Sequence, residues 1–105
     1  MERYAWKAII KEGMLDEYKK RHNQIWPELV EVLKQAGICN YTIWNTENFV
    51  FGYYECEYGN EYAARIQATS PVVDQWNEYM KTVMTMETDP VTGAQPKLEQ
   101  VFFME

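Results

Sequence analysis

The sequence predicts an α+β fold in which helices cover one face of an antiparallel sheet. Two observations carry this expectation. The hydrophobic period changes between two and about 3.6 residues along the chain, and the segments succeed one another as strand, helix, strand, strand, helix, strand. That order is typical of a ferredoxin-like sandwich. The chain has 105 residues, the usual length of one domain, so residues 1–105 are expected to form a single domain.

The first half of the chain contains one strand and one interrupted helix. Apolar residues alternate over residues 3–10, which predicts a strand. Residues 14–36 then change to helical spacing. Pro27 has no N–H for an interior helical hydrogen bond, so the helix is expected to break near 23–26 and to restart with Pro27 in its first turn. Gly37 is a suitable residue for ending the second segment.

The second half begins with a hairpin. Residues 40–45 and 48–57 have strand character, and a short polar sequence connects them. A helical segment follows at 60–69. Ser70 then precedes a proline, and this pair predicts a helix N-terminus that opens a helix over residues 71–85.

The C-terminal part is expected to complete the sheet. Residues 86–96 contain two prolines and a glycine and are expected to form a loop, and residues 98–103 are expected to form the last strand. The strands carry large apolar residues on both faces, as the neighbours Val50 and Phe51 illustrate. Helices can cover only one of these faces, and an uncovered apolar face is typical of an interface. We therefore expect a homodimer packed through the sheets.

Composition excludes several kinds of partner. The net charge of −6 argues against nucleic acids and anionic membranes, because these require clustered cations. The apolar runs are too short for a membrane helix, and the first residues lack the apolar core of a signal peptide, so we expect the cytoplasm. Cys39 and Cys56 form no CxxC motif, and with a single histidine the chain has no zinc-ligand pattern. Both cysteines are expected to be reduced thiols, and no metal site is expected.

His22 is the single histidine and therefore the only side chain whose ordinary pKa lies near neutrality. Tyr18 lies one turn earlier on the same apolar stripe, so the two could act as an acid/base pair. A core histidine held by a hydrogen bond, with Tyr18 packed beside it, explains the same spacing. Tyr41 and Trp76 likewise suit either a ligand pocket or a core. The chain contains no glycine-rich phosphate loop, GxSxG elbow or HExxH motif, so hydrolase, kinase and nucleotide-binding functions have no support.

The run EYKKRHNQIWPEL at residues 17–29 resembles the signature EYxxRHxxIWPEL of the L-rhamnose mutarotase family, which includes relatives that act on L-fucose. This signature is long and specific. The resemblance covers essentially the whole chain and continues through Gly37, Asn40, Tyr41, Trp76, Tyr79, Met80, Asp89, Val101 and Phe102.

The resemblance implies a dimeric α/β barrel and an enzyme that interconverts the α and β anomers of a 6-deoxyhexose, L-rhamnose or a relative such as L-fucose. It implies neither a metal nor an organic cofactor. His22 matches the family's proton donor, while Tyr18 and Tyr41 match tyrosines that contact the sugar. Trp76 matches the first of two tandem tryptophans in the rhamnose enzymes. Asn77 replaces the second and is expected to border the substrate.

Mutarotation suits these residue types. The sugar ring opens when the ring oxygen gains a proton and the anomeric hydroxyl loses one, and an imidazole can exchange protons at neutral pH. Two departures from the rhamnose pattern, Asn77 and the stretch ETDPVTGAQP at residues 87–96, concern the choice of sugar rather than the chemistry. Two other functions suit an aromatic pocket with one histidine: a small cofactor-free monooxygenase or lactone isomerase on the same fold, and a non-catalytic sugar-binding module.

Overall fold

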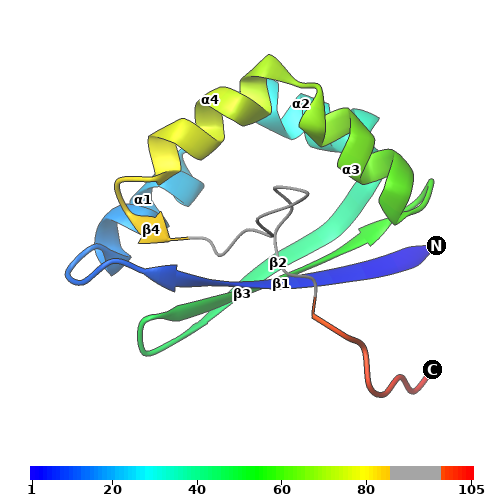
Figure 1. The fold of residues 1–105 in the computed structure, drawn as a ribbon, viewed down its shortest axis with the longest axis horizontal. Coiled ribbons are helices and arrows are strands. Elements are labelled where there is room, and N and C mark those ends of the chain that lie inside the picture. The colour runs from blue at the N-terminus through cyan, green and yellow to red at the C-terminus, as the bar shows by residue number, and fades with distance from the viewer. Residues whose placement is uncertain (86–97) are drawn as a thin grey trace, which may run out of the picture.

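The structure, a computed structural model, describes residues 1–85 and 98–105. Within these residues one antiparallel sheet carries four helices, all on the same face (Figure 1). The elements in chain order are β1 (Glu2–Ile10), α1 (Leu15–Asn23), α2 (Pro27–Gln35), β2 (Ile38–Thr46), β3 (Phe49–Cys56), α3 (Asn60–Ala68), α4 (Pro71–Met80) and β4 (Met84–Thr85).

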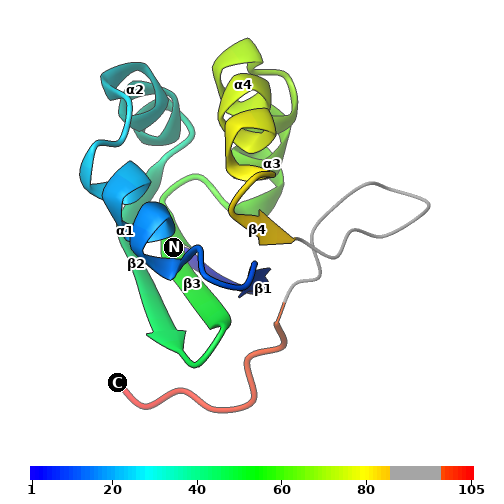
Figure 2. The ribbon, with the colours of Figure 1, turned by 90° about the vertical axis from the view of Figure 1, so that its left-hand side faces the viewer.

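The sheet has the strand order β2-β3-β1-β4, and every neighbouring pair is antiparallel. β2 and β3 form the expected hairpin, while β1 lies between β3 and β4. Seen from the side in Figure 2, α1 and α2 lie next to α3 and α4 above the sheet. The prediction of an α+β, ferredoxin-like fold is confirmed.

Local sequence signals place the helix ends where expected. α1 ends at Asn23 and α2 begins at Pro27, so the predicted interruption is confirmed. Gly37 follows α2 with a φ of 79°, a left-handed conformation that glycine adopts without strain. The Ser70 hydroxyl accepts a hydrogen bond from the backbone N–H of Val73 at 3.3 Å and thereby caps α4.

The predicted helix over 71–85 is too long. α4 ends at Met80, and Met84–Thr85 forms the short strand β4 at the edge of β1. The backbone N–H of Val83 closes the intervening turn on the carbonyl of Met80 at 3.0 Å. Val83 and Met84 are both buried, so the apolar period continues after the helix has ended, and period alone could not detect the turn.

The predicted last strand over 98–103 is wrong, because these residues form no regular element. The backbone N–H of Leu98 donates to the carbonyl of Ala5 at 2.8 Å, but no ladder follows from this contact. The tail instead passes below the sheet, opposite the helices (Figure 1), where the Phe103 ring lies 3.8 Å from the Arg3 guanidinium. The loop expected at 86–96 lies outside the described residues.

The sheet face opposite the helices, called the outer face below, is rich in apolar side chains. Its apolar and aromatic residues are Ala5, Ile9, Trp44, Phe49, Phe51 and Tyr53, with the polar residues Lys7, Thr42 and Thr46 among them. Most of these are half-buried, but 69% of Trp44 is exposed. No described helix covers this face (Figure 1), so the sequence-based expectation of an uncovered apolar face agrees with the arrangement of the elements. None of the described helices is long and apolar enough to cross a membrane.

Gly52 makes room for a large side chain of the core. It lies opposite Trp6 across the β1–β3 pair, and a Cβ at position 52 would collide with the Trp6 indole. Trp6 is 4% exposed and packs under the helices. The absence of a side chain at Gly52 therefore sets the depth at which this indole lies.

Replacing Gly52 with alanine is expected to lower the free energy of unfolding by about 1–3 kcal/mol, because the added methyl overpacks the core against Trp6. Urea denaturation of the variant measures the change. The matched experiment repeats the substitution in a Trp6→Phe background, where the smaller ring should reduce the cost. An unchanged unfolding midpoint in the wild-type background would show that the indole moves aside freely.

Candidate active site

The five residues predicted for the site surround one cavity between the sheet and the helices. This central cavity, with a volume of ≈ 100 Å³, is lined in part by Tyr18, His22, Tyr41, Trp76 and Asn77. Cavities of ≈ 260 and ≈ 330 Å³ lie beside it, the first between α1 and the β2–β3 hairpin and the second between α2 and β2. His22 lines all three and therefore lies where these spaces meet.

One hydrogen bond fixes the orientation of His22. Its Nδ1 lies 3.0 Å from the backbone carbonyl oxygen of Tyr18, one turn earlier in α1. A carbonyl oxygen can only accept, so Nδ1 carries the proton and Nε2 of the neutral ring carries a lone pair. Burial lowers the pKa of His22 below its ordinary value, although the bond to Tyr18 acts in the opposite direction. The ring is thereby kept neutral and able to accept a proton near pH 7.

Aromatic rings enclose the imidazole. The Tyr18 ring lies 4.3 Å from it between centroids, and the Trp76 ring meets it edge-on at 5.5 Å. Trp76 is itself held edge-on by Trp26, with centroids 5.1 Å apart, and Trp26 stacks on Tyr79. Trp26 thus links the start of α2 to α4 and supports Trp76 from behind. Such a wall suits the apolar face of a small ligand.

A β-bulge turns Tyr41 toward the cavity. The β2–β3 register places Cys39 opposite Glu55 and Thr42 opposite Tyr53, so β2 has one extra residue between these pairs. Regular alternation would send Tyr41 to the outer face, and the extra residue reverses this. The Tyr41 hydroxyl accepts a hydrogen bond from Trp6 Nε1 at 3.1 Å, beneath the helices.

The cavity contains an unusual group of phenols. Tyr41 and Tyr54 have ring centroids 4.9 Å apart, and Tyr54 stacks on Tyr4 at 5.0 Å. Burial raises the pKa of Tyr18, Tyr41 and Tyr54, so all three remain protonated donors. The Tyr18 hydroxyl is buried and has no hydrogen-bond partner within the described part of the chain.

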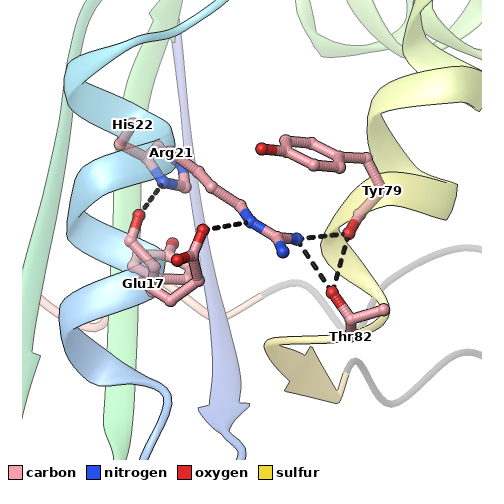
Figure 3. A network of polar contacts seen from close by, with 6 residues as sticks. Glu17, Arg21, His22, Tyr79 and Thr82 are labelled. Atoms are coloured by element: carbon pink, nitrogen blue, oxygen red, sulfur yellow. Dashed lines mark hydrogen bonds and ion pairs between the residues drawn. The ribbon is translucent and has the colours of Figure 1, made fainter.

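Arg21 connects α1 to the end of α4 (Figure 3). Its Nε donates to Glu17 at 2.9 Å, and one terminal nitrogen donates to the carbonyl of Tyr79 at 2.6 Å and to the Thr82 hydroxyl at 2.9 Å. The guanidinium also lies 4.0 Å from the centre of the Tyr79 ring. A cation at a helix C-terminus is favourable, and the planar guanidinium suits several acceptors at once. Arg21 thereby fixes the distance between the helices that carry His22 and Trp76.

Among the cavity-lining residues that sequence reasoning missed, three carry polar groups, namely Trp6, Tyr54 and Gln67. Trp6 lies in the strand predicted over residues 3–10, but its pairing with Gly52 is not visible in the sequence. Gln67 lies on α3, whose helical pattern carried no functional signal. Among residues 1–85 and 98–105, no group of three or more His, Cys, Asp or Glu side chains could hold a metal ion.

Comparison with known proteins decides between the functions that this geometry allows. The family model described as "L-rhamnose mutarotase" matches residues 3–104. The chain belongs to the L-rhamnose mutarotase family. Membership makes it an isomerase that acts on carbohydrates, as the sequence predicted, and argues against a monooxygenase or a lactone isomerase.

Relatives in this family cover the chain from end to end. It is 34% identical to the L-rhamnose mutarotase of Formosa agariphila, with 100% of both chains covered. It is 39% identical to that of Mesorhizobium japonicum, with 98% of this chain and 97% of the relative covered. The crystal structure of an L-rhamnose mutarotase from Formosa agariphila superposes with a TM-score of 0.79 at 32% identity, again over 100% of both chains. The mutarotase fold is therefore shared as a whole.

Proposed function

We propose that this chain interconverts the α and β anomers of L-rhamnose in the central cavity, with His22 as the acid/base residue. One observation supports this most directly: His22, the single histidine of the chain, lies where three cavities meet among the residues matching the family's sugar contacts. Tyr18, Tyr41, Trp76 and Asn77 are proposed to bind the sugar.

The chemistry requires only proton transfers. Ring opening moves a proton from the anomeric hydroxyl and delivers one to the ring oxygen, and closure on the other carbonyl face reverses both transfers. A neutral His22 can take part because its Nε2 carries a lone pair. The apolar ring of Trp76, which Trp26 supports from behind, suits the methyl group or apolar face of a deoxysugar.

Asn77 is proposed to tune the choice of sugar. Asn77 lines the central cavity and is also exposed to solvent, as expected for a position at the cavity edge. An amide here supplies a donor and an acceptor in place of an apolar indole. The Asn77→Trp variant is therefore expected to narrow the pocket and to shift the activity ratio toward L-rhamnose and away from L-fucose.

Two-dimensional exchange NMR on L-rhamnose, L-fucose, L-lyxose and D-sugars, with wild type and Asn77→Trp in parallel, tests both the substrate and the role of position 77. L-rhamnose is expected to exchange fastest with wild type. If Asn77→Trp still turns over sugar but its ratio of activity on L-rhamnose to activity on L-fucose is unchanged, Asn77 does not determine the choice of sugar. Binding of sugar without faster exchange would favour a non-catalytic sugar-binding module.

A homodimer formed through the outer faces is also proposed. The exposed Trp44 and the half-buried apolar residues around it support this arrangement, since an uncovered apolar face of this kind is unfavourable in water. The C-terminal tail adds further exposed apolar side chains on the same side, such as Phe102 with 78% exposure. We further propose a cytoplasmic location, where the half-buried Cys39 would remain a reduced thiol.

A further inference from the structure

We propose that the side chains of Asn40 and Glu55 form a clamp across the β2–β3 pair that holds the Tyr41 hydroxyl inside the central cavity. Asn40 and Glu55 are thereby positioning residues, because they act through Tyr41 and do not touch the reacting atoms. Their effect on the sugar rests on the proposed function, in which Tyr41 binds it. The clamp itself is a property of the fold and can be measured without sugar.

Tyr41 depends on its backbone because it comes from a strand at the edge of the sheet. Within the described part of the chain, β2 pairs with β3 alone. Tyr41 is 38% exposed, although its hydroxyl accepts the hydrogen bond from Trp6 Nε1 at 3.1 Å beneath the helices. Its ring contacts one aromatic neighbour, Tyr54, with centroids 4.9 Å apart. Core packing alone does not fix a side chain with this exposure, so the direction of Tyr41 follows from the bulge.

Asn40 gives the bulge its backbone conformation. It precedes Tyr41 in the stretch of β2 where the register with β3 shifts by one residue. Its φ is 50°, in the left-handed region. Glycine often occupies such a position in a bulge, and asparagine is among the few other residues that adopt this conformation readily. A contact that holds the Asn40 side chain therefore also holds the bulge in the form that turns Tyr41 inward.

Glu55 supplies that contact from the neighbouring strand. Asn40 Nδ2 donates to one of its carboxylate oxygens at 2.5 Å, and the Tyr53 hydroxyl donates to the other at 3.0 Å. These two bonds hold the pKa of Glu55 below its ordinary value, so the carboxylate is ionised at neutral pH. A hydrogen bond to an ionised acceptor is roughly twice as strong as one between neutral groups. The Asn40 amide is thus held by a charged group that Tyr53 orients.

The clamp reaches the central cavity only through Tyr41. Glu55 alternates with the inward-facing Tyr54 and shares the outer face with Tyr53, and neither Glu55 nor Tyr53 lines the central cavity. Asn40 borders the side cavity between α2 and β2, but its amide is engaged by Glu55. Tyr41 follows Asn40 in the chain and does line the central cavity. A change in the clamp is therefore transmitted to the sugar by the position of the Tyr41 hydroxyl.

Reversing the polarity of the clamp tests it. In Asn40→Asp, two carboxylates face each other and the hydrogen bond is lost. In the double variant Asn40→Asp/Glu55→Gln, the new amide can donate to the aspartate with its nitrogen and accept from the Tyr53 hydroxyl with its oxygen. The bond is then restored with donor and acceptor exchanged, and the net charge equals that of wild type. Such a pair of variants separates the clamp from the separate effects of either residue.

The first readout is the NMR resonance of the Trp6 Nε1–H, which donates to Tyr41. Tyr41→Phe removes the acceptor and gives the reference for a lost bond. In Asn40→Asp, the resonance is expected to move toward this reference, and its exchange with solvent to quicken by roughly three- to tenfold. The double variant should return both to wild-type values. This measurement requires neither sugar nor turnover.

The second readout is the affinity for L-rhamnose. The dissociation constant is expected to rise by roughly three- to tenfold in Asn40→Asp and to return to within about twofold of wild type in the double variant. The maximal exchange rate should change less, because His22 is untouched. In a Tyr41→Phe background, Asn40→Asp should have no further effect on affinity, since the hydroxyl that the clamp positions is already absent.

Two further variants support the comparison. Asn40→Gly adopts the left-handed conformation without strain but lacks the amide, so it should change both readouts in the same direction as Asn40→Asp. It tests the clamp even if the paired carboxylates prevent folding. Glu57→Gln removes an exposed carboxylate just after β3 and should match wild type in both readouts.

An unchanged Trp6 resonance in Asn40→Gly and Asn40→Asp would overturn the clamp, whether or not the protein turns over sugar. Lost affinity that the double variant does not restore would also contradict it, because Asn40 would then contact the sugar directly. An equal loss of affinity in the Tyr41→Phe background would assign Asn40 to the fold in general rather than to Tyr41. Wild type that does not accelerate anomer exchange would overturn the proposed function, while a Trp6 resonance that moves in Asn40→Asp and returns in the double variant would still support the clamp.

Discussion

Replacing His22 with asparagine is expected to slow the exchange of L-rhamnose anomers by roughly 10²-fold or more, because the site loses its proton acceptor near neutral pH. The amide cannot replace the imidazole in proton transfer, whereas the ring of Trp76 still lines the cavity. L-rhamnose should therefore still bind. Exchange NMR measures the rate, and a titration measures the affinity.

Lys20→Asn provides the matched control, because Lys20 is an exposed residue of the same helix. Its exchange rate should stay within about twofold of wild type, as expected for a surface change. A folded His22→Asn variant with near-native exchange would remove His22 from the mechanism.

The lowered pKa of His22 also gives the sign of the pH dependence. The protein-catalysed rate should be constant around pH 7 and fall on acidification below pH 6.5, as the neutral ring becomes protonated.

Sedimentation of the wild-type protein at micromolar concentration is expected to give a mass twice the 12.5 kDa of one chain. Trp44→Lys should shift the protein toward the single-chain mass, because it places a charge in the middle of the proposed interface between outer faces. The substitution should change the stability of the isolated chain by less than about 0.5 kcal/mol, since 69% of Trp44 is exposed there.

Tyr58→Lys is the control for this experiment. Tyr58 is an exposed aromatic residue like Trp44, with 62% of its surface accessible. It lies near α2 and α3 rather than on the outer face. It should leave the mass of the assembly unchanged. A single-chain mass for wild type would contradict the proposed dimer, and equal effects of the two substitutions would place the interface elsewhere.

Local features of the fold could be predicted because they depend on residues close in the sequence. Pro27 interrupts a helix wherever it occurs, and Ser70 before a proline caps a helix through its own hydroxyl. The strand β4 could not be predicted, because it has only two residues, Met84 and Thr85, and they form a strand only by pairing with β1, which is distant in the sequence. The apolar run at 98–103 satisfied the pattern of a strand without a ladder to join, so pattern alone was misleading there.

The candidate site also combines features that the local sequence predicts with features that depend on contacts across the sheet. His22 and Tyr18 share one helical turn, so the helical period alone places them on the same face of α1. The inward direction of Tyr41 depends on a bulge whose extra residue appears only in the pairing of β2 with β3. The position of Trp6 depends on Gly52 across the sheet. The resemblance to the family indicated that Tyr41 belongs to the site but not why its side chain points inward. The bulge in β2 explains that direction.

The central claim is that this chain catalyses mutarotation, and saturation-transfer NMR on L-rhamnose tests it most directly. Saturating the resonance of one anomeric proton should diminish the other at a rate that rises in proportion to the protein concentration and exceeds the rate in buffer. The same preparation should show sugar binding in a titration. Exchange no faster than in buffer at every protein concentration, in a sample that binds L-rhamnose, would contradict the account.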